Sequence, residues 1–185
     1  MINFKELTPE NWKDFEQLFG ERGACEGCWC MYWRLQRKDY KPNRGNNNKK
    51  SMKKLVKNNR QIGILMYVDN KPIGWCSVAP REDFIRLQNS RILKPIDDKP
   101  VWSIACFFMD KKFRRKGYSI ELLQAVIRIT KKKGAEILEG YPHEPKNGNM
   151  PAAFAWTGIS SAINKVGFKE VVRRSETRPV MRLNL

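Results

Sequence analysis

Five cationic side chains crowd one short turn in the middle of this chain, and they point to a site for a strongly anionic ligand. They are Lys111, Lys112, Arg114, Arg115 and Lys116. Gly117 and Ser119 follow, and their small size lets a ligand approach the backbone closely. Backbone N–H groups at the start of a helix attract phosphate because they lack a partner within the helix. We therefore predict that this turn binds a phosphate group.

The elements on either side of the turn are those that would position such a site. The apolar run over residues 101–109 predicts a buried strand. After the turn, apolar residues recur at helical spacing, at positions 120, 122, 123, 126, 127 and 129. Three lysines and Gly134 end this predicted helix, and residues 137–141 predict the next strand. Strand, phosphate turn, helix and strand together make a βαβ unit.

The same patterns predict the remaining elements. They indicate a strand over residues 2–7, a helix from Thr8-Pro9 to Gly20, a short helix over residues 31–37, a helix over residues 49–58, a hairpin of strands 62–68 and 72–78, a helical turn near residues 82–87, a helix near residues 152–166, and a final pair of strands over residues 168–173 and 179–183.

The turn sequence resembles the acetyl-CoA signature of the GNAT acyltransferase superfamily. Residues 114–119 read Arg-Arg-Lys-Gly-Tyr-Ser, and the family pattern is Gln/Arg-x-x-Gly-x-Gly/Ala. The sequence departs from the pattern only at Ser119, where the family has glycine or alanine, and serine is also small. Residues 162–168, Ala-Ile-Asn-Lys-Val-Gly-Phe, are similar to a family helix that ends in Gly-Phe. The resemblance implies one GNAT-like domain over residues 1–185. Its fold class would be α+β (α/β-like), with a central mixed, mostly antiparallel sheet of about six to seven strands flanked by about four helices.

The resemblance implies that the chain is an enzyme, an acetyl-CoA-dependent N-acetyltransferase. Acetyl-CoA would be the co-substrate, and a primary amine would attack its thioester directly in a ternary complex. The turn would hold the pyrophosphate, and the end of the preceding strand would run beside the pantetheine arm. The cofactor-binding residues so implied are Phe107, Phe108, Met109, Arg114, Arg115, Lys116, Gly117, Tyr118, Ser119 and Ile120.

The resemblance leaves the acid and the base of the reaction open. Many relatives carry a tyrosine four residues before the glycine of Gly-Phe, where this chain has Ile163, which cannot donate a proton. Tyr141 is the first candidate for the acid, and Glu139 and His143 are candidates for the base. The simpler alternatives are a solvated strand carboxylate for Glu139 and an ordinary loop residue for His143. A covalent cysteine mechanism would need a base beside the thiol, and nothing in the sequence places His143 next to a cysteine.

The cysteine-rich segment near residue 30 has two interpretations. Cys25, Cys28 and Cys30 have a spacing that could hold a metal, but tetrahedral zinc needs four ligands, and Cys76 and Cys106 lie on predicted core strands. We therefore predict buried thiols and no metal. In GNAT-like proteins this segment commonly lines the acceptor pocket. The substrate-pocket residues so implied are Trp29, Met31, Trp33 and Arg34.

Composition sets the outer limits of the interpretation. The chain has 185 residues, 41% of them apolar, and no run approaches the ~20 apolar residues of a membrane span. We expect a cytoplasmic protein with no membrane partner. The net charge of +17 attracts polyanions, but the basic tract over residues 41–60 lacks interleaved aromatics, so nucleic acid is not expected as the main partner. The alternative function is a non-catalytic acyl-CoA-sensing or polyanion (RNA)-binding module on the same fold. Because domains of the family that this chain resembles often pair, the resemblance also allows a homodimer.

Overall fold

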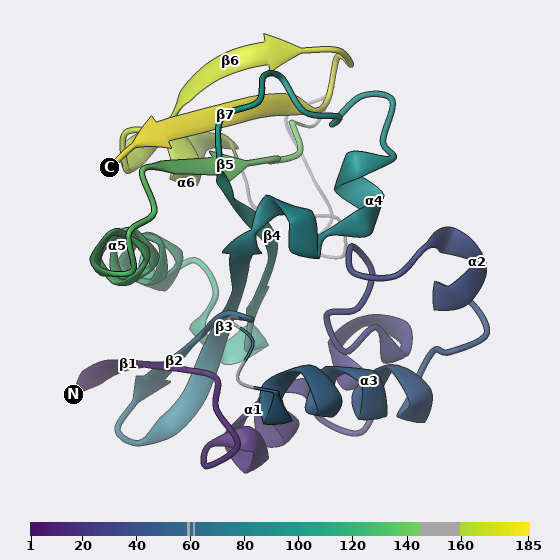
Figure 1. The fold of residues 1–185 in the computed structure, drawn as a ribbon. Helices are drawn as coiled ribbons and strands as arrows, with labels where there is room; N and C mark the ends of the chain where they lie inside the picture. The colour runs from purple at the N-terminus through teal and green to yellow at the C-terminus, as the bar shows by residue number, and fades with distance from the viewer. Residues whose placement is uncertain (59, 61, 145–159) are drawn as a thin grey trace.

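A sheet of seven strands forms the centre of the molecule (Figure 1). The computed structural model describes residues 1–58, 60, 62–144 and 160–185, and within them the strand order is β1-β2-β3-β4-β5-β7-β6. The strands are β1 (Ile2–Glu6), β2 (Ile64–Val68), β3 (Lys71–Pro80), β4 (Trp102–Met109), β5 (Ile137–Gly140), β6 (Lys169–Arg173) and β7 (Pro179–Asn184). Of the neighbouring pairs, β4 with β5 is parallel and the others are antiparallel. The predicted fold class is confirmed.

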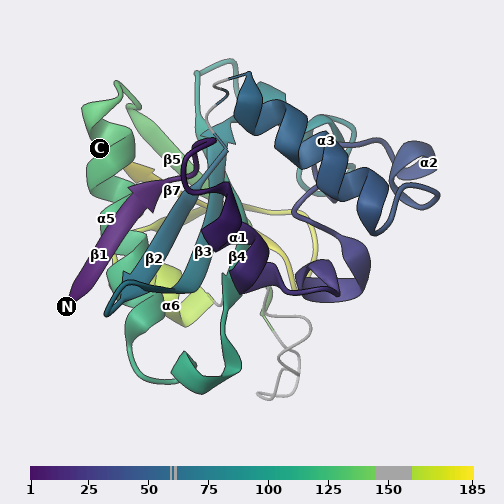
Figure 2. The ribbon, with the colours of Figure 1, turned by 90° about the horizontal axis from the view of Figure 1, so that it is seen from below.

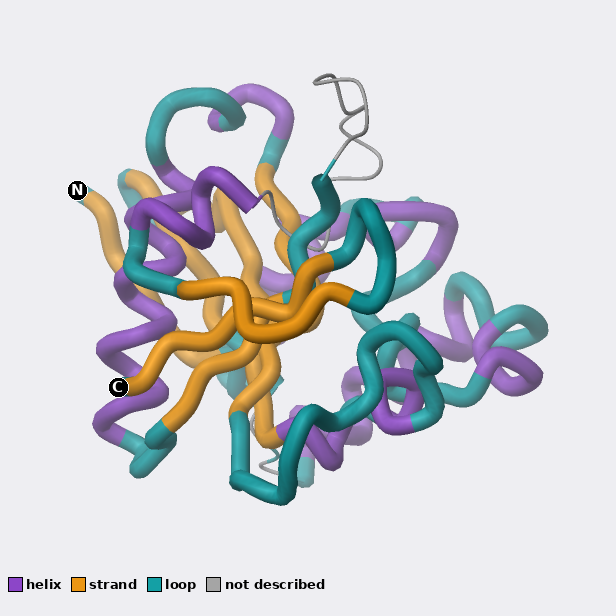
Figure 3. The backbone as a smooth tube through the Cα atoms, turned by 90° about the horizontal axis from the view of Figure 1, so that it is seen from above, coloured by secondary structure: helices purple, strands orange, loops and turns teal. Residues whose placement is uncertain are grey.

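Helices cover both faces of this sheet. They are α1 (Trp12–Phe19), α2 (Arg37–Tyr40), α3 (Asn46–Lys57), α4 (Ile85–Gln88), α5 (Tyr118–Lys132) and α6 (Ser160–Lys165). Figures 1 and 2 show α5 and α6 on one side of the sheet and α3 with α2 on the other, and Figure 3 shows the strands between them from above. Within the described residues, none of the helices combines the length and apolar character of a membrane span.

Each face of the sheet buries its own apolar core. On the side of α5, Leu122, Leu123 and Val126 pack with Ile104 of β4 and Leu138 of β5. These helix residues belong to the apolar stripe that the spacing predicts, so the βαβ unit around the basic turn is confirmed. The core therefore fixes the end of β4 and the start of α5 relative to each other.

On the other face, α1 and α3 pack with the cysteine-rich segment. Phe15 of α1, Met52 of α3 and Trp29 bury against Leu65 of β2 and Trp75 of β3. The aromatic rings of Phe15 and Trp75 meet edge to face, with their centroids 4.8 Å apart. This core holds the segment before α2 against the middle of the sheet.

The helix predicted over residues 31–37 is wrong. The chain makes turns there, the extended backbone of Gln36 (ψ 158°) interrupts them, and α2 begins only at Arg37. Two residues just before, Trp29 and Cys30, have left-handed backbones with φ of 43° and 60°. A left-handed backbone cannot continue an α-helix, and the packing that imposes it is not visible in the local sequence.

Two predicted helix starts are also wrong by a few residues. The first helix begins at Trp12, because the Asn11 side chain holds the preceding turn: it accepts a hydrogen bond from the Thr8 N–H (2.8 Å) and donates one to the Glu6 carbonyl (2.7 Å). Helix α3 begins at Asn46, before the predicted residue 49. The helix predicted near residues 152–166 lies partly outside the described residues, and α6 is its described part.

The parallel contact between β4 and β5 is short. It consists of three residue pairs, which join Trp102, Ser103 and Ile104 to β5. A bulge follows in β4, because Ser77 of β3 pairs with Cys106 while the next residue of β3 pairs with Ile104. Beyond this point β4 continues to its end with β3 on one side and, among the described residues, no strand on the other.

Candidate functional site

The open edge of β4 is the first component of the candidate site. Residues 106–109 pair with β3 but not with β5, and Ala105 is the unpaired residue of the bulge; β5 ends at Gly140 (Figure 1). An unpaired strand edge presents backbone N–H and C=O groups to a ligand that has its own amide groups. Phe107, Phe108 and Met109 on this edge are all partly buried, and all three belong to the predicted cofactor-binding set.

The basic turn is the second component, and it lies directly after this edge. A short 3-10 turn, Lys111–Phe113, follows β4, and Asp110 caps it by accepting a hydrogen bond from the Lys112 N–H (3.0 Å). The Arg114 side chain folds back so that its Nε donates to the Met109 carbonyl (2.9 Å). Its guanidinium thereby ties the turn to the end of the open strand.

The backbone of the turn exposes unpaired donors. Gly117 has a φ of 85° and forms the N-cap of α5 without a side-chain cap. In the described part of the chain, the N–H groups of Gly117, Tyr118 and Ser119 have no hydrogen-bond acceptor. A Cβ at Gly117 would have no atom within 4 Å, so the space in front of these donors is open. Three free N–H groups at the positive end of a fifteen-residue helix make an anion site.

The other residues predicted for the turn surround these donors. Arg115 and Lys116 are exposed, and Arg115 adopts a left-handed backbone with φ of 60°. The ring centroids of Phe113 and Tyr118 lie 5.8 Å apart, and Ile120 is partly buried on the first turn of α5. The structure thus brings the whole predicted turn together at one end of β4.

Tyr141 and Glu139, predicted as acid and base, lie in a buried network of charges. Each is 1% exposed. The Glu139 carboxylate accepts hydrogen bonds from the Tyr141 hydroxyl (2.6 Å), from Arg81 (2.6 Å) and from Arg182 (2.7 Å). The Tyr141 hydroxyl also bonds with Arg81 and lies 2.7 Å from the Ser103 hydroxyl. Both carboxylate oxygens are occupied and sealed from solvent.

This arrangement favours a structural role over proton transfer. Burial, followed by the adjacent negative charge of Glu139, raises the pKa of Tyr141 well above its ordinary value. The phenol therefore stays protonated and donates to the carboxylate, and Glu139, which already accepts three hydrogen bonds and is sealed from solvent, is not open to an amine. The catalytic roles of Tyr141 and Glu139 stay predictions that this geometry does not favour.

Arg81 is the residue of this network that sequence reasoning missed. It follows β3 directly, and besides Glu139 it donates to the carbonyls of Leu87 (3.3 Å) and Leu93 (2.6 Å). One side chain thus joins the irregular segment after β3 to the end of β5. No local motif marks Arg81, although a carboxylate inside an apolar strand, as at Glu139, requires a buried cation.

His143 differs from the other two candidates. It lies three residues beyond β5, is partly buried, and its Nδ1 has no hydrogen-bond partner among the described residues. Of the predicted acid and base residues, His143 is therefore the one whose side chain has a polar atom without a partner among the described residues, and that atom is sealed from solvent.

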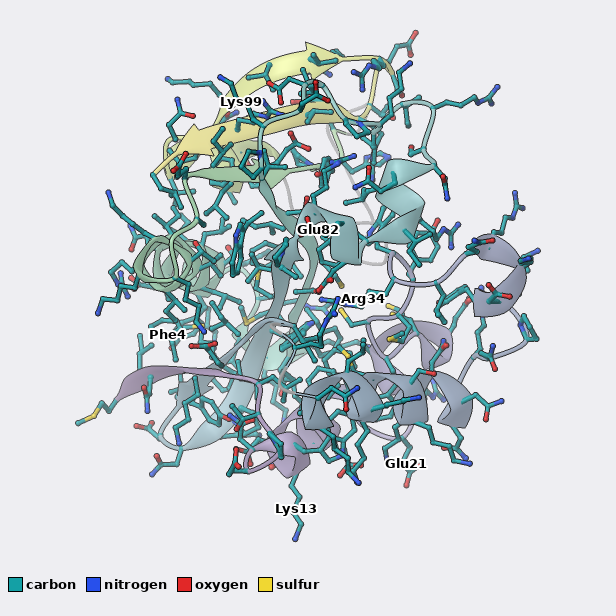
Figure 4. The ribbon with its side chains drawn as sticks, in the orientation of Figure 1. Phe4, Lys13, Glu21, Arg34, Glu82 and Lys99 are labelled. Atoms are coloured by element: carbon teal, nitrogen blue, oxygen red, sulfur yellow. The ribbon has the colours of Figure 1, made fainter. Side chains whose placement is uncertain are left out.

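The residues predicted for an acceptor pocket are buried. Trp29, Met31, Trp33 and Arg34 are each exposed by 9% or less. Arg34 lies in the interior (Figure 4), where its guanidinium pairs with Asp83 (3.4 Å) and donates to a backbone carbonyl. These four side chains act as core residues here, and their role in an acceptor pocket stays a prediction.

The five cysteines are all free thiols. In the part of the chain that the structure describes, no group of three or more histidine, cysteine or acidic side chains could hold a metal ion. Cys25 is exposed, Cys28 is partly buried, and the other three are buried.

Comparison with known proteins gives a consistent picture. The model of the acetyltransferase (GNAT) family matches residues 15–153. A search of curated protein sequences finds no significant match. Among solved structures, the chain is similar over 100% of its length to the PaiA N-acetyltransferase of Thermoplasma acidophilum in complex with coenzyme A, with 16% identity, 99% of that chain covered and a TM-score of 0.57.

Two further structures share the fold. A GNAT-family acetyltransferase of Streptococcus pneumoniae has 13% identity and a TM-score of 0.58, with 100% of this chain and 99% of that chain covered. Arabidopsis thaliana NAA60 in complex with acetyl-CoA has 12% identity and a TM-score of 0.54, with both chains covered completely. At these identities the likeness establishes the fold.

Proposed function

The chain belongs to the acetyltransferase (GNAT) family, and from that premise we propose that it transfers an acetyl group from acetyl-CoA to a primary amine. The observation that carries the proposal is the set of free N–H groups on Gly117, Tyr118 and Ser119, which follow directly on the cationic residues of the turn. A diphosphate matches this site in charge and in its number of acceptor oxygens.

The open edge of β4 supports the same ligand. From the phosphate turn, a ligand that extends along residues 105–109 reaches the point where β5 separates from β4. The amides of a pantetheine arm would pair with the unpaired backbone groups of this edge, as a further strand would. Acetyl-CoA supplies the activated acyl group as a thioester.

The residues of the chain would promote transfer mainly by alignment. Holding the two reactants in register contributes up to ~7–11 kcal/mol in well-oriented systems. Backbone donors near the bulge of β4 would stabilise the oxyanion that forms when the amine attacks. We assign the role of base to His143, whose buried Nδ1 has no hydrogen-bond partner among the described residues; the amine would have to reach this nitrogen directly or through one water.

One observation favours a second candidate, a non-catalytic acyl-CoA-sensing module. Ile163 is fully buried at the position where many relatives carry a tyrosine, and Tyr141 is sealed within its network. No side chain that can donate a proton therefore stands free at the predicted acid positions. The module would bind acetyl-CoA through the same turn and release no product.

Steady-state release of free CoA separates the two candidates. The protein is mixed with acetyl-CoA and a panel of small amines, polyamines, lysine peptides and peptides with free N-termini, and the new thiol is measured. Amine-dependent release that His143→Ala lowers at least tenfold, with unchanged acetyl-CoA affinity, supports the transferase and this base. Tight binding without release from any amine supports the module, and absence of binding refutes both.

A further inference from the structure

Four exposed lysines lie along one face of α3, and we call them the lysine stripe. They are Lys50, Lys53, Lys54 and Lys57. Their spacing of i, i+3, i+4 and i+7 places them on the same side of a helix. The opposite side of α3 carries Met52 and Val56, which are buried in the core. The packing of α3 therefore turns all four positive charges toward solvent.

The surroundings of the stripe contain few negative charges. Residues 40–60 include eight lysines and arginines and no aspartate or glutamate. Lys49, beside the stripe, pairs with Glu16 of α1 (2.8 Å), and Arg44 pairs with Glu26 (2.8 Å). Within the described part of the chain, no carboxylate forms an ion pair with a lysine of the stripe. The fold thus leaves these four charges uncompensated.

The lysines of the stripe also repel one another. Each has two of the others three or four residues away along the helix, where like charges weaken a helix. Exposed helix faces that serve only solubility usually mix the two signs of charge. A partner with closely spaced negative charges would remove this repulsion on binding, so the stripe is complementary to a polyanion.

The chemistry of this face favours a nucleic acid over a protein as that polyanion. Protein interfaces depend on apolar and aromatic anchors and contain few lysines. The exposed large apolar side chains of the described chain all lie outside residues 40–60. A phosphate backbone needs no such anchor, because lysines bind it through charge. The stripe is ~10 Å long at 1.5 Å per helical residue, and a duplex carries about six phosphate charges over that length.

We propose that the lysine stripe binds the phosphate backbone of a nucleic acid without reading its sequence. The basic tract lacks the interleaved aromatics that bases would stack on, and contact with phosphate alone does not require them. Helix α3 lies on the opposite side of the sheet from α5 (Figures 1 and 2), so the stripe is separate from the basic turn before α5. Binding at the stripe is therefore independent of acetyl-CoA and of acetyl transfer.

Two variants that lose the same number of charges test this surface. The first replaces the stripe, as K50Q/K53Q/K54Q/K57Q. The control replaces four exposed lysines on other elements, as K71Q/K94Q/K131Q/K132Q. Glutamine preserves helix propensity, and loss of the like-charge pairs should leave the melting temperature of the stripe variant unchanged or higher.

Fluorescence anisotropy with a fluorescein-labelled DNA duplex, repeated over a series of salt concentrations, measures binding. We expect the stripe variant to bind at least ~30-fold more weakly. The slope of log affinity against log salt should become shallower by about 3–4, because each phosphate contact contributes ~0.9. The control variant should bind less than ~5-fold more weakly, because charges beyond the Debye length are largely screened. Saturating acetyl-CoA should leave duplex binding to the unaltered protein unchanged.

Four results would overturn the assignment. The unaltered protein fails to bind the duplex, or both variants weaken binding equally, in which case net charge alone attracts it. Acetyl-CoA displaces the duplex, which would then lie on the basic turn. Polyglutamate or phosphatidylserine vesicles bind the stripe more tightly than the duplex at equal charge, which would indicate an acidic protein or a membrane. Because duplex binding is measured without an amine and without CoA release, its failure is distinct from a failure of acetyl transfer.

Discussion

Two glycines at opposite ends of α5 allow the anion site to be tested with a matched control. Gly117 precedes the helix with φ 85°, and Gly134 follows it with φ 83°. At both positions a new Cβ would have no atom within 4 Å. Replacing either glycine by valine therefore imposes a similar backbone strain, and in the free protein the new Cβ meets no atom at either position. Gly117 alone borders the three unpaired N–H groups.

The size of each effect follows from this geometry. A left-handed backbone costs a residue with a side chain roughly 1–2 kcal/mol, so both variants should lose a similar free energy of unfolding. In G117V, the new side chain fills the space in front of the donors. Losing even one charge-assisted hydrogen bond of the ligand costs about 1.5–3 kcal/mol. A loss of about 2 kcal/mol raises the dissociation constant of acetyl-CoA ~30-fold.

Two measurements check this prediction. Urea denaturation should show equal destabilisation of G117V and G134V. Titration calorimetry should show weaker acetyl-CoA binding for G117V and unchanged binding for G134V. S-acetylpantetheine, which has no diphosphate, should bind all three proteins alike. Equal acetyl-CoA affinity of the two variants would refute the assignment of the diphosphate to this turn.

Three further predictions concern charge. Ser119→Asp places a carboxylate at the start of α5, where negative charge is favourable, so the melting temperature should be unchanged or higher. Calorimetry should nevertheless show acetyl-CoA binding at least ~10-fold weaker, because the new charge repels phosphate. Glu139→Gln leaves Arg81 without its buried counter-charge, while Arg182 keeps its ion pair with Asp97, and should lower the free energy of unfolding in urea by about 3–5 kcal/mol. Burial raises the pKa of Tyr40 from 10.0 to about 12, so the folded protein holds this proton more tightly than the unfolded chain does. The free energy of unfolding should therefore fall as the pH rises from 10 to about 12, and it should fall less in Tyr40→Phe.

The parts of the fold that local sequence determines could be predicted. The strand before the basic turn, the turn itself and α5 follow from consecutive residues whose spacing alone indicates a buried strand, an anion site and an amphipathic helix. The small residues Gly117 and Ser119 likewise mark a close backbone approach. The resemblance to a family then supplied the ligand, which spacing by itself does not identify.

The parts that depend on distant residues could not be predicted. Arg81 and Glu139 meet from positions 58 residues apart, so neither carries a local sign of its partner. The turns that replace the predicted helix after Cys30 arise because Trp29 and Cys30 pack into the core with left-handed backbones. The burial of Tyr141, which argues against its predicted role as an acid, likewise becomes visible only once Ser103 and Arg81 surround it.

The short contact between β4 and β5 has a mechanical consequence. Strands β1 to β4 form one half of the sheet and β5 to β7 the other, and three residue pairs of β4 and β5 hold the halves in register. The ion pair between Arg81 and Glu139 bridges the halves at that same place. The gap beyond Ile104 is therefore held at one end only by this short contact, while the core on the α5 side, which packs Ile104 of β4 with Leu138 of β5 and Met181 of β7, resists rotation of one half against the other.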